Sequence, residues 1–150
     1  MANGPDQSPH ILVVVARFYE DIADALVAGA SEVLESGGAT FETVAVPGAF
    51  EIPTAIGFAH RGGGFDGYVA LGCVIRGETT HYDYVCGESA RGLTMLAVEH
   101  GAAIGFGILT TEDRPQAWAR AAVDQGNKGA HAARACLDMV ALRQRFVDRP

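Results

Sequence analysis

Four short apolar runs, each followed by a segment of helical periodicity, restrict what this chain can fold into. The runs cover residues 11–16, 41–46, 68–75 and 104–110, and most of them are rich in β-branched residues. The continuous apolar runs at 11–16 and 68–75 are typical of buried strands, and the other two runs predict strands as well. Strands that alternate with helices predict a parallel sheet with helices packed against both of its faces.

The segments between the runs carry the signals that start and stop helices. Glycines at positions 37, 38 and 101 end the first and third helical segments, and the glycine-rich residues 126–129 interrupt the last helical region. We therefore predict an α/β fold of the flavodoxin-like kind, a three-layer α/β/α sandwich around a mostly parallel four-stranded sheet. Residues 1–9 are expected to form a flexible N-terminal tail, and residues 10–150 a single domain.

The charge and the cysteines of the chain argue against nucleic-acid binding, membrane binding and a metal site. The chain has 11 basic and 18 acidic residues, a formal net charge of −7, so we expect neither a nucleic-acid partner nor an anionic membrane. No apolar stretch is long enough to cross a bilayer, and the N-terminus does not have the pattern of a signal peptide. The three cysteines lack the spacing of metal ligands, which predicts a cytoplasmic protein without a metal site.

The loop after the third run carries the strongest candidate site. In open parallel sheets, ligands bind beyond the carboxyl ends of the strands. At that edge the apolar run is followed by a turn at Gly77. Thr79, Thr80 and His81 then come at the start of the next helix. Hydroxyls and the N–H groups of a helix start suit a phosphate, and an imidazole beside it can transfer protons near neutral pH. The alternative is a capped helix with a surface histidine.

Four other residues have both a structural and a functional interpretation. Phe18, directly after the first strand, is either the edge of the core or a platform for a flat ring. Glu51, at a helix start, either complements the helix dipole or binds a ligand. Arg120 and Lys128 are either solvated charges or ligand-binding cations, and the glycines that flank Lys128 favour a ligand in its case.

Five segments in order resemble the 6,7-dimethyl-8-ribityllumazine synthase family of riboflavin biosynthesis. They are ARF at 16–18, VPGAFEIP at 46–53, GCVIRGETTHYD at 72–83, FGILTT at 106–111 and GNKG at 126–129. The resemblance extends over residues 11–146. It implies an enzyme that joins 5-amino-6-(D-ribitylamino)uracil to 3,4-dihydroxy-2-butanone 4-phosphate without a cofactor or a metal.

The resemblance also implies roles for individual residues. Phe18 would stack on the pyrimidine ring, His81 would be the catalytic proton-transfer group, and Arg120 would act with it as the cation that binds the phosphate. The remaining substrate-binding residues that the resemblance implies are Ala49, Phe50, Glu51, Val74, Ile75, Glu78, Thr79, Thr80, Phe106 and Lys128.

In the family, the residues matching Phe106, Arg120 and Lys128 reach the site from a neighbouring subunit. The resemblance thus implies a homo-oligomer, a pentamer or a multiple of it, without fixing which. Tyr19 stands where many members have Asn, and His131 where many have Glu. The alternatives are a non-catalytic flavin- or lumazine-binding or shell-forming relative, and a monomeric flavodoxin-like nucleotide binder.

Overall fold

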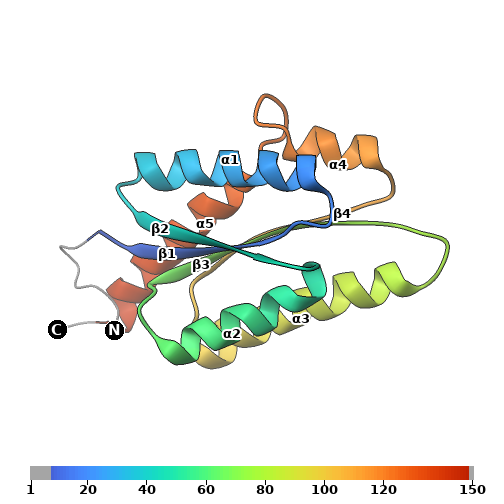
Figure 1. Cartoon of the computed structure of the whole chain (residues 1–150). Coiled ribbons are helices and arrows are strands. Elements are labelled where there is room, and N and C mark those ends of the chain that lie inside the picture. The colour runs from blue at the N-terminus through green and yellow to red at the C-terminus, as the bar shows by residue number, and fades with distance from the viewer. Residues whose placement is uncertain (1–7, 149–150) are drawn as a thin grey trace.

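The computed structural model describes residues 8–148, and its centre is a four-stranded parallel sheet (Figure 1). The strands are β1 (His10–Ala16), β2 (Thr40–Val46), β3 (Gly67–Ile75) and β4 (Ile104–Thr111). Their order across the sheet is β2-β1-β3-β4, so β2 and β4 form its two edges. The parallel sheet that the alternating pattern predicts is confirmed.

Within residues 8–148, five α-helices and one short 3-10 helix lie between or after the strands. They are α1 (Glu20–Ser36), the 3-10 helix η1 (Ala49–Glu51), α2 (Ile52–Gly62), α3 (His81–His100), α4 (Arg114–Ala121) and α5 (Lys128–Phe146). Gly101 ends α3 in the left-handed conformation, with φ of 70°, which glycine adopts without strain. The predicted break at residues 126–129 separates α4 from α5.

The sheet separates two apolar cores, as the three-layer prediction requires. Ile11, Val13 and Val15 of β1 pack on the side covered by α1, α4 and α5. The alternate residues Leu12 and Val14 pack on the side of η1, α2 and α3. Figure 1 shows α1 and α4 above the sheet and α2 and α3 below it. Successive side chains of a strand point to opposite faces, so a strand covered on both faces must be apolar throughout.

Helix α5 packs unusually close to the edge strand β4. A Cβ atom on Gly105 would lie 1.8 Å from the backbone oxygen of Ala132, and one on Gly107 would lie 2.9 Å from the Ala132 Cβ. Only glycine lets a helix backbone approach a strand this closely. This close approach places the start of α5 beside β4.

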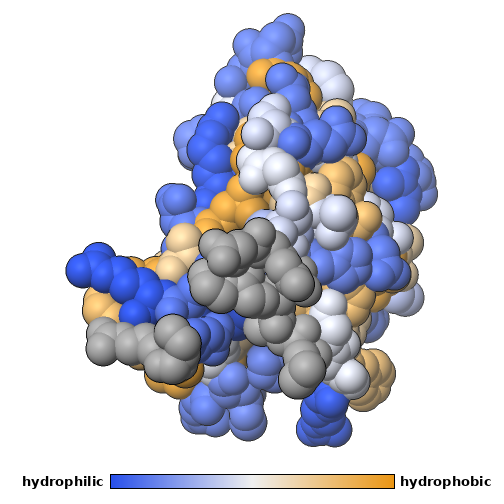
Figure 2. All heavy atoms as spheres, turned by 90° about the vertical axis from the view of Figure 1, so that its left-hand side faces the viewer, coloured by the Kyte–Doolittle hydropathy of each residue, from blue (hydrophilic) through white to orange (hydrophobic). Residues whose placement is uncertain are grey.

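The loops that follow the strands all lie at one end of the sheet, and β1 starts at the other end (Figure 1). Figure 2 faces that other end, where hydrophilic side chains cover much of the visible surface. Of the predicted N-terminal tail, residues 1–7 lie outside the described residues, and the Pro9 carbonyl accepts a 3.0 Å hydrogen bond from the Thr40 N–H. Within residues 8–148, no helix has both the length and the apolar character that a membrane span needs.

Candidate functional site

A cavity of about 420 Å³ opens at the carboxyl ends of β1 and β3. We call it the first cavity. Seven predicted site residues line it: Phe18, Ala49, Phe50, Glu51, Val74, Ile75 and His81. They come from the segments that follow β1 and β2, from the end of β3 and from the start of α3. The parallel sheet brings these segments together because the carboxyl ends of its strands share one edge.

Two aromatic rings in the first cavity are left without core packing. The Phe18 side chain is 73% exposed and Phe50 is 55% exposed. The half-buried Tyr19 meets the Phe18 ring edge to face, with centroids 4.9 Å apart and planes at 74°. Burial raises the pKa of the Tyr19 hydroxyl, which keeps it protonated. Phe18 thus has a free face that a flat, partly polar ring can cover.

His81 is the first residue of the 20-residue helix α3. Its backbone N–H donates to Thr79 Oγ1 at 3.3 Å, so the Thr79 hydroxyl lies at the positive end of the helix dipole. Glu78, Thr79 and Thr80 are exposed on the loop that leads to His81, beside the first cavity rather than in its lining. This end of α3 can bind an anion, and the neighbouring imidazole can exchange protons with it.

Carboxylates neutralise the three arginines that follow β1, β3 and β4. The pairs are Arg17 with Glu20 and Asp24, Arg76 with Glu112 and Asp83, and Arg114 with Asp21. The hydrogen bonds to Asp24 and Glu20 raise the pKa of Arg17, and the hydrogen bond from Arg114 lowers the pKa of Asp21. A guanidinium shared with carboxylates is a poor ligand for a further anion, so these arginines do not supply the cation that a phosphate requires.

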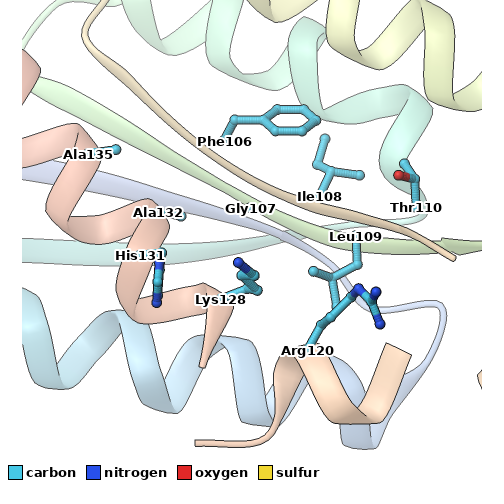
Figure 3. Close-up of a pocket in the computed structure, with 10 residues that line it drawn as sticks. All are labelled: Phe106, Gly107, Ile108, Leu109, Thr110, Arg120, Lys128, His131, Ala132 and Ala135. Atoms are coloured by element: carbon cyan, nitrogen blue, oxygen red, sulfur yellow. The ribbon is translucent and has the colours of Figure 1, made fainter. Parts of the chain in front are cut away.

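A second cavity, also about 420 Å³, lies along β4 beside α4 and α5 (Figure 3). Phe106, Arg120, Lys128 and His131 line it, and the Phe106 ring is 50% exposed. In Figure 3, Phe106 projects from one side of β4, whereas Lys128 and Arg120 lie on the other. Arg120 Nη1 donates to the Gln116 carbonyl at 3.0 Å, and among the described residues no carboxylate lies within ion-pair distance of it.

Lys128 occupies an unfavourable position for a cation in an isolated helix. It is the first residue of α5, where the helix dipole is positive and acidic residues are preferred. The preceding Asn127 has φ of 48°, and its Oδ1 is buried without a hydrogen-bond partner. Such local conflicts are typical of functional sites. The second cavity therefore carries cations that are available for an anionic ligand.

The two cavities have no lining residue in common. A single chain therefore presents His81 in the first cavity and Arg120 in the second, and does not bring them together in one pocket. Among residues 8–148, no group of three or more His, Cys, Asp or Glu side chains lies close enough together to hold a metal ion. Two residues with polar side chains in these cavities, Thr110 and Cys73, were not among the candidate site residues of the sequence. The other polar lining residues were all named from the sequence.

Sequence reasoning also missed the contacts of Arg76. Its guanidinium contacts Glu112, Asp83 and the ring of Tyr82. The available signal was its place after a strand, at the sheet edge where ligands bind. The partners themselves are up to 36 positions away in sequence, which no local pattern reveals.

Comparisons with known proteins agree with these features. Residues 8–144 match the family model described as 6,7-dimethyl-8-ribityllumazine synthase. A protein of that name from Bartonella tribocorum is 54% identical over 143 residues, which are 95% of each chain. The 6,7-dimethyl-8-ribityllumazine synthase 1 of Rhizobium meliloti is 57% identical over 142 residues, 91% of this chain and 93% of that one. The protein of that family name from Agrobacterium fabrum is 52% identical over 143 residues, 92% of this chain and 97% of that one.

Proposed function

The chain belongs to the 6,7-dimethyl-8-ribityllumazine synthase family, and from this membership we infer that it is an enzyme that catalyses the lumazine synthase step of riboflavin biosynthesis. The reaction joins 5-amino-6-(D-ribitylamino)uracil to 3,4-dihydroxy-2-butanone 4-phosphate. An amine of the uracil adds to the butanone carbonyl and loses water to give an imine. Inorganic phosphate then leaves, and the second nitrogen closes the ring with loss of another water.

The first cavity is suited to the pyrimidine. Its free Phe18 face can stack on the flat ring, and Phe50 adds a second exposed aromatic side chain. Ala49, Glu51 and the chain at Val74 and Ile75 surround the same space. Their backbone groups and the Glu51 carboxylate can hold the uracil edge and the ribityl hydroxyls, which fixes the reacting amine in one orientation.

The start of α3 is suited to the phosphate and to proton transfer. Thr79 and Thr80, with Glu78 beside them, lie just before the helix whose positive end favours an anion. Each step moves protons between nitrogen, carbon and oxygen, so the imidazole of His81 can contribute repeatedly as a proton donor and acceptor. Hydroxyls, helix N–H groups and one Arg can bind the phosphate group of the substrate. They also allow inorganic phosphate to dissociate once it has been eliminated.

The observation that carries this assignment is the division of the site between two cavities. The first has the aromatic platform and the imidazole, but its nearby arginines are paired with carboxylates. The second has Arg120 and Lys128. We propose that a neighbouring protomer presents its Phe106, Arg120 and Lys128 to the first cavity. A contact between two different surfaces of one chain generates a ring when its rotation closes, and we propose a closed pentamer or a multiple of it.

We also propose a cytoplasmic location. All three cysteines are free thiols, and Cys73 and Cys136 are buried. Burial raises the pKa of Cys73 to about 11 and that of Cys136 to about 12, so both stay protonated and unreactive. This is the usual state of cysteines in a reducing compartment.

The test is to mix the two substrates with the purified protein and to follow the fluorescence of the lumazine. We expect formation well above the spontaneous rate of the same mixture without protein. A rate equal to that background, from protein of intact fold, would refute the assignment. Light scattering of the same sample gives the mass of the assembly, and a monomer would contradict the shared site.

A further inference from the structure

We propose that Arg76 is a positioning residue that fixes the loop of residues 77–80 and thereby the imidazole of His81. The inference rests on the proton-transfer role proposed above for His81. Arg76 directly follows β3, and its backbone N–H donates to the Thr111 carbonyl at 2.9 Å. The residue therefore starts the loop from a fixed point on the sheet.

The guanidinium of Arg76 reaches the far end of the same loop. Its Nη1 lies 3.5 Å from an Asp83 carboxylate oxygen in the first turn of α3. Its Cζ lies 4.2 Å from the centroid of the Tyr82 ring, within the range of a cation–π contact. Tyr82 and Asp83 are the two residues that follow His81. Arg76 thus connects both ends of the segment that carries Thr79, Thr80 and His81.

A third contact fixes the guanidinium to the next loop of the sheet. Arg76 Nε donates to Glu112 at 2.8 Å, and this hydrogen bond raises the pKa of Arg76. Glu112 follows β4 and leads into α4, the helix that carries Arg120. The planar guanidinium presents several donors in a fixed geometry, so one side chain holds three partners at once.

The loop has little else to hold it. Residues 77–80 are exposed, and Thr80 at the start of α3 makes no side-chain capping bond. The contacts recorded there are the 3.3 Å bond from the His81 N–H to Thr79 and backbone bonds from residues 83 and 84 to the Thr80 carbonyl. A displacement of about 1 Å in a reacting group can cost about a hundredfold in rate, so this loop requires an anchor.

Arg76 is not itself placed to bind the phosphate. Both of its recorded ion pairs are to carboxylates, and its flat face lies over Tyr82. A phosphate ligand would have to displace these partners. The positioning role therefore predicts a change in kcat, whereas direct phosphate binding predicts a change in the KM of the butanone phosphate.

The variants are Arg76→Met, which keeps the volume of the stem, and Arg76→Lys, which keeps only the charge. We expect Arg76→Met to lower kcat about 10- to 100-fold, with the KM of the pyrimidine unchanged, and Arg76→Lys to recover only part of the loss. The matched control is Arg91→Met. Arg91 and Glu88 both lie in α3 and form an exposed ion pair, with 2.7 Å between Arg91 Nη2 and a Glu88 carboxylate oxygen. That control should leave kcat unchanged.

A double-mutant cycle separates the loop contact from general destabilisation. Asp83→Asn in the Arg76→Met background should cause no further loss of kcat, because the contact is already broken. Full additivity of the two losses would contradict the proposal. An unchanged kcat in Arg76→Met would overturn it, and so would a raised KM for the butanone phosphate at constant kcat, since that result assigns Arg76 to the phosphate.

A second readout needs no turnover and so does not depend on the proposed reaction. Amide hydrogen exchange of the assembled protein without substrate should be faster at residues 77–84 in Arg76→Met than in the wild type. Exchange in α1 and α5 should not change. If the wild-type protein has no activity but Arg76→Met still exchanges faster at residues 77–84, the enzyme assignment is refuted and the anchoring role stands. Unchanged exchange at residues 77–84 would overturn the anchoring role.

Discussion

His81 and Arg120 line two different cavities of the same protomer, one at the carboxyl ends of β1 and β3 and the other along the edge strand β4. An imidazole for proton transfer and a guanidinium for phosphate binding act on one substrate only if they face one pocket. We therefore propose that the site is completed by a second copy of the chain.

Mixed assemblies of two inactive variants should regain activity. His81→Ala keeps Arg120, and Arg120→Ala keeps His81, so a site between the two kinds of protomer contains both side chains. Random 1:1 mixing gives each site a chance of about one half of receiving either intact residue, so activity should return to about a quarter of the wild-type level. The measurement is lumazine formation after the variants are unfolded and refolded together.

The control for this experiment is a mixture of the same variants that is never dissociated. It should stay inactive, because its sites remain between identical protomers. Recovery no greater than the sum of the separate variants, in assemblies shown by mass to be mixed, would mean that one protomer supplies both groups.

Arg120→Ala should raise the KM of the butanone phosphate much more than that of the pyrimidine. The loss of a charge-assisted hydrogen bond costs about 1.5–3 kcal/mol, which corresponds to about a 10- to 150-fold change. Initial rates measured with each substrate varied in turn give the two constants. Arg120→Lys should recover part of the loss, and equal effects on both substrates would argue against a phosphate contact.

Phe18→Ala should have the opposite selectivity. Removal of an aromatic platform under a flat ring costs about 1–3 kcal/mol, so the KM of the pyrimidine should rise roughly 5- to 150-fold. Because Phe18 is 73% exposed, its removal should change the free energy of unfolding little. Phe18→Trp should retain binding. A stability loss in Phe18→Ala without a change in KM would identify the ring as packing only.

Gly105→Ala should destabilise the fold, because the added Cβ would lie 1.8 Å from the Ala132 carbonyl oxygen. Overpacking of this kind costs on the order of 1–3 kcal/mol or more. The matched control is Gly87→Ala in the exposed part of α3, where no atom lies within 4 Å of the new Cβ. That variant should gain roughly 0.5–1 kcal/mol from helix propensity. Urea unfolding at one fixed protein concentration measures both.

Stability should fall with pH in the alkaline range because of Cys136. Burial raises its pKa from 9.0 to about 12, so above pH 9 the unfolded chain releases this proton while the folded chain retains it. The unfolded state then binds fewer protons, and the free energy of unfolding decreases by about 1.4 kcal/mol per pH unit for one such thiol. Cys136→Ala should have a slope smaller by about that amount between pH 10 and 11. Equal slopes would contradict the effect of burial.

Most of the fold was predictable because its two central strands, β1 and β3, are covered on both faces. Such strands must be apolar along their whole length, so the runs at residues 11–16 and 68–75 are visible without any knowledge of the partners. Parallel pairing followed from the helices between the runs. The packing of α5 on β4 was not predictable, since nothing near Gly105 indicates that its neighbour is the backbone of Ala132.

The site was predictable only in part, and for a related reason. Phe18, Glu51 and His81 follow the ends of strands, and parallel strands place their carboxyl ends together. Local sequence therefore indicates which residues share the first cavity. It does not indicate that the guanidinium of Arg76 holds Asp83 and Glu112, because such contacts depend on the side-chain directions that packing fixes.

The apolar runs and the helical segments between them were enough to predict the layers and the parallel sheet, since burial acts on each residue wherever its partner lies. The folded chain decided which charges remain available. It pairs Arg17, Arg76 and Arg114 with carboxylates and leaves Arg120 and Lys128 in a separate cavity. Electrostatic pairing depends on distances between side chains that are far apart in sequence, and only the three-dimensional structure sets those distances.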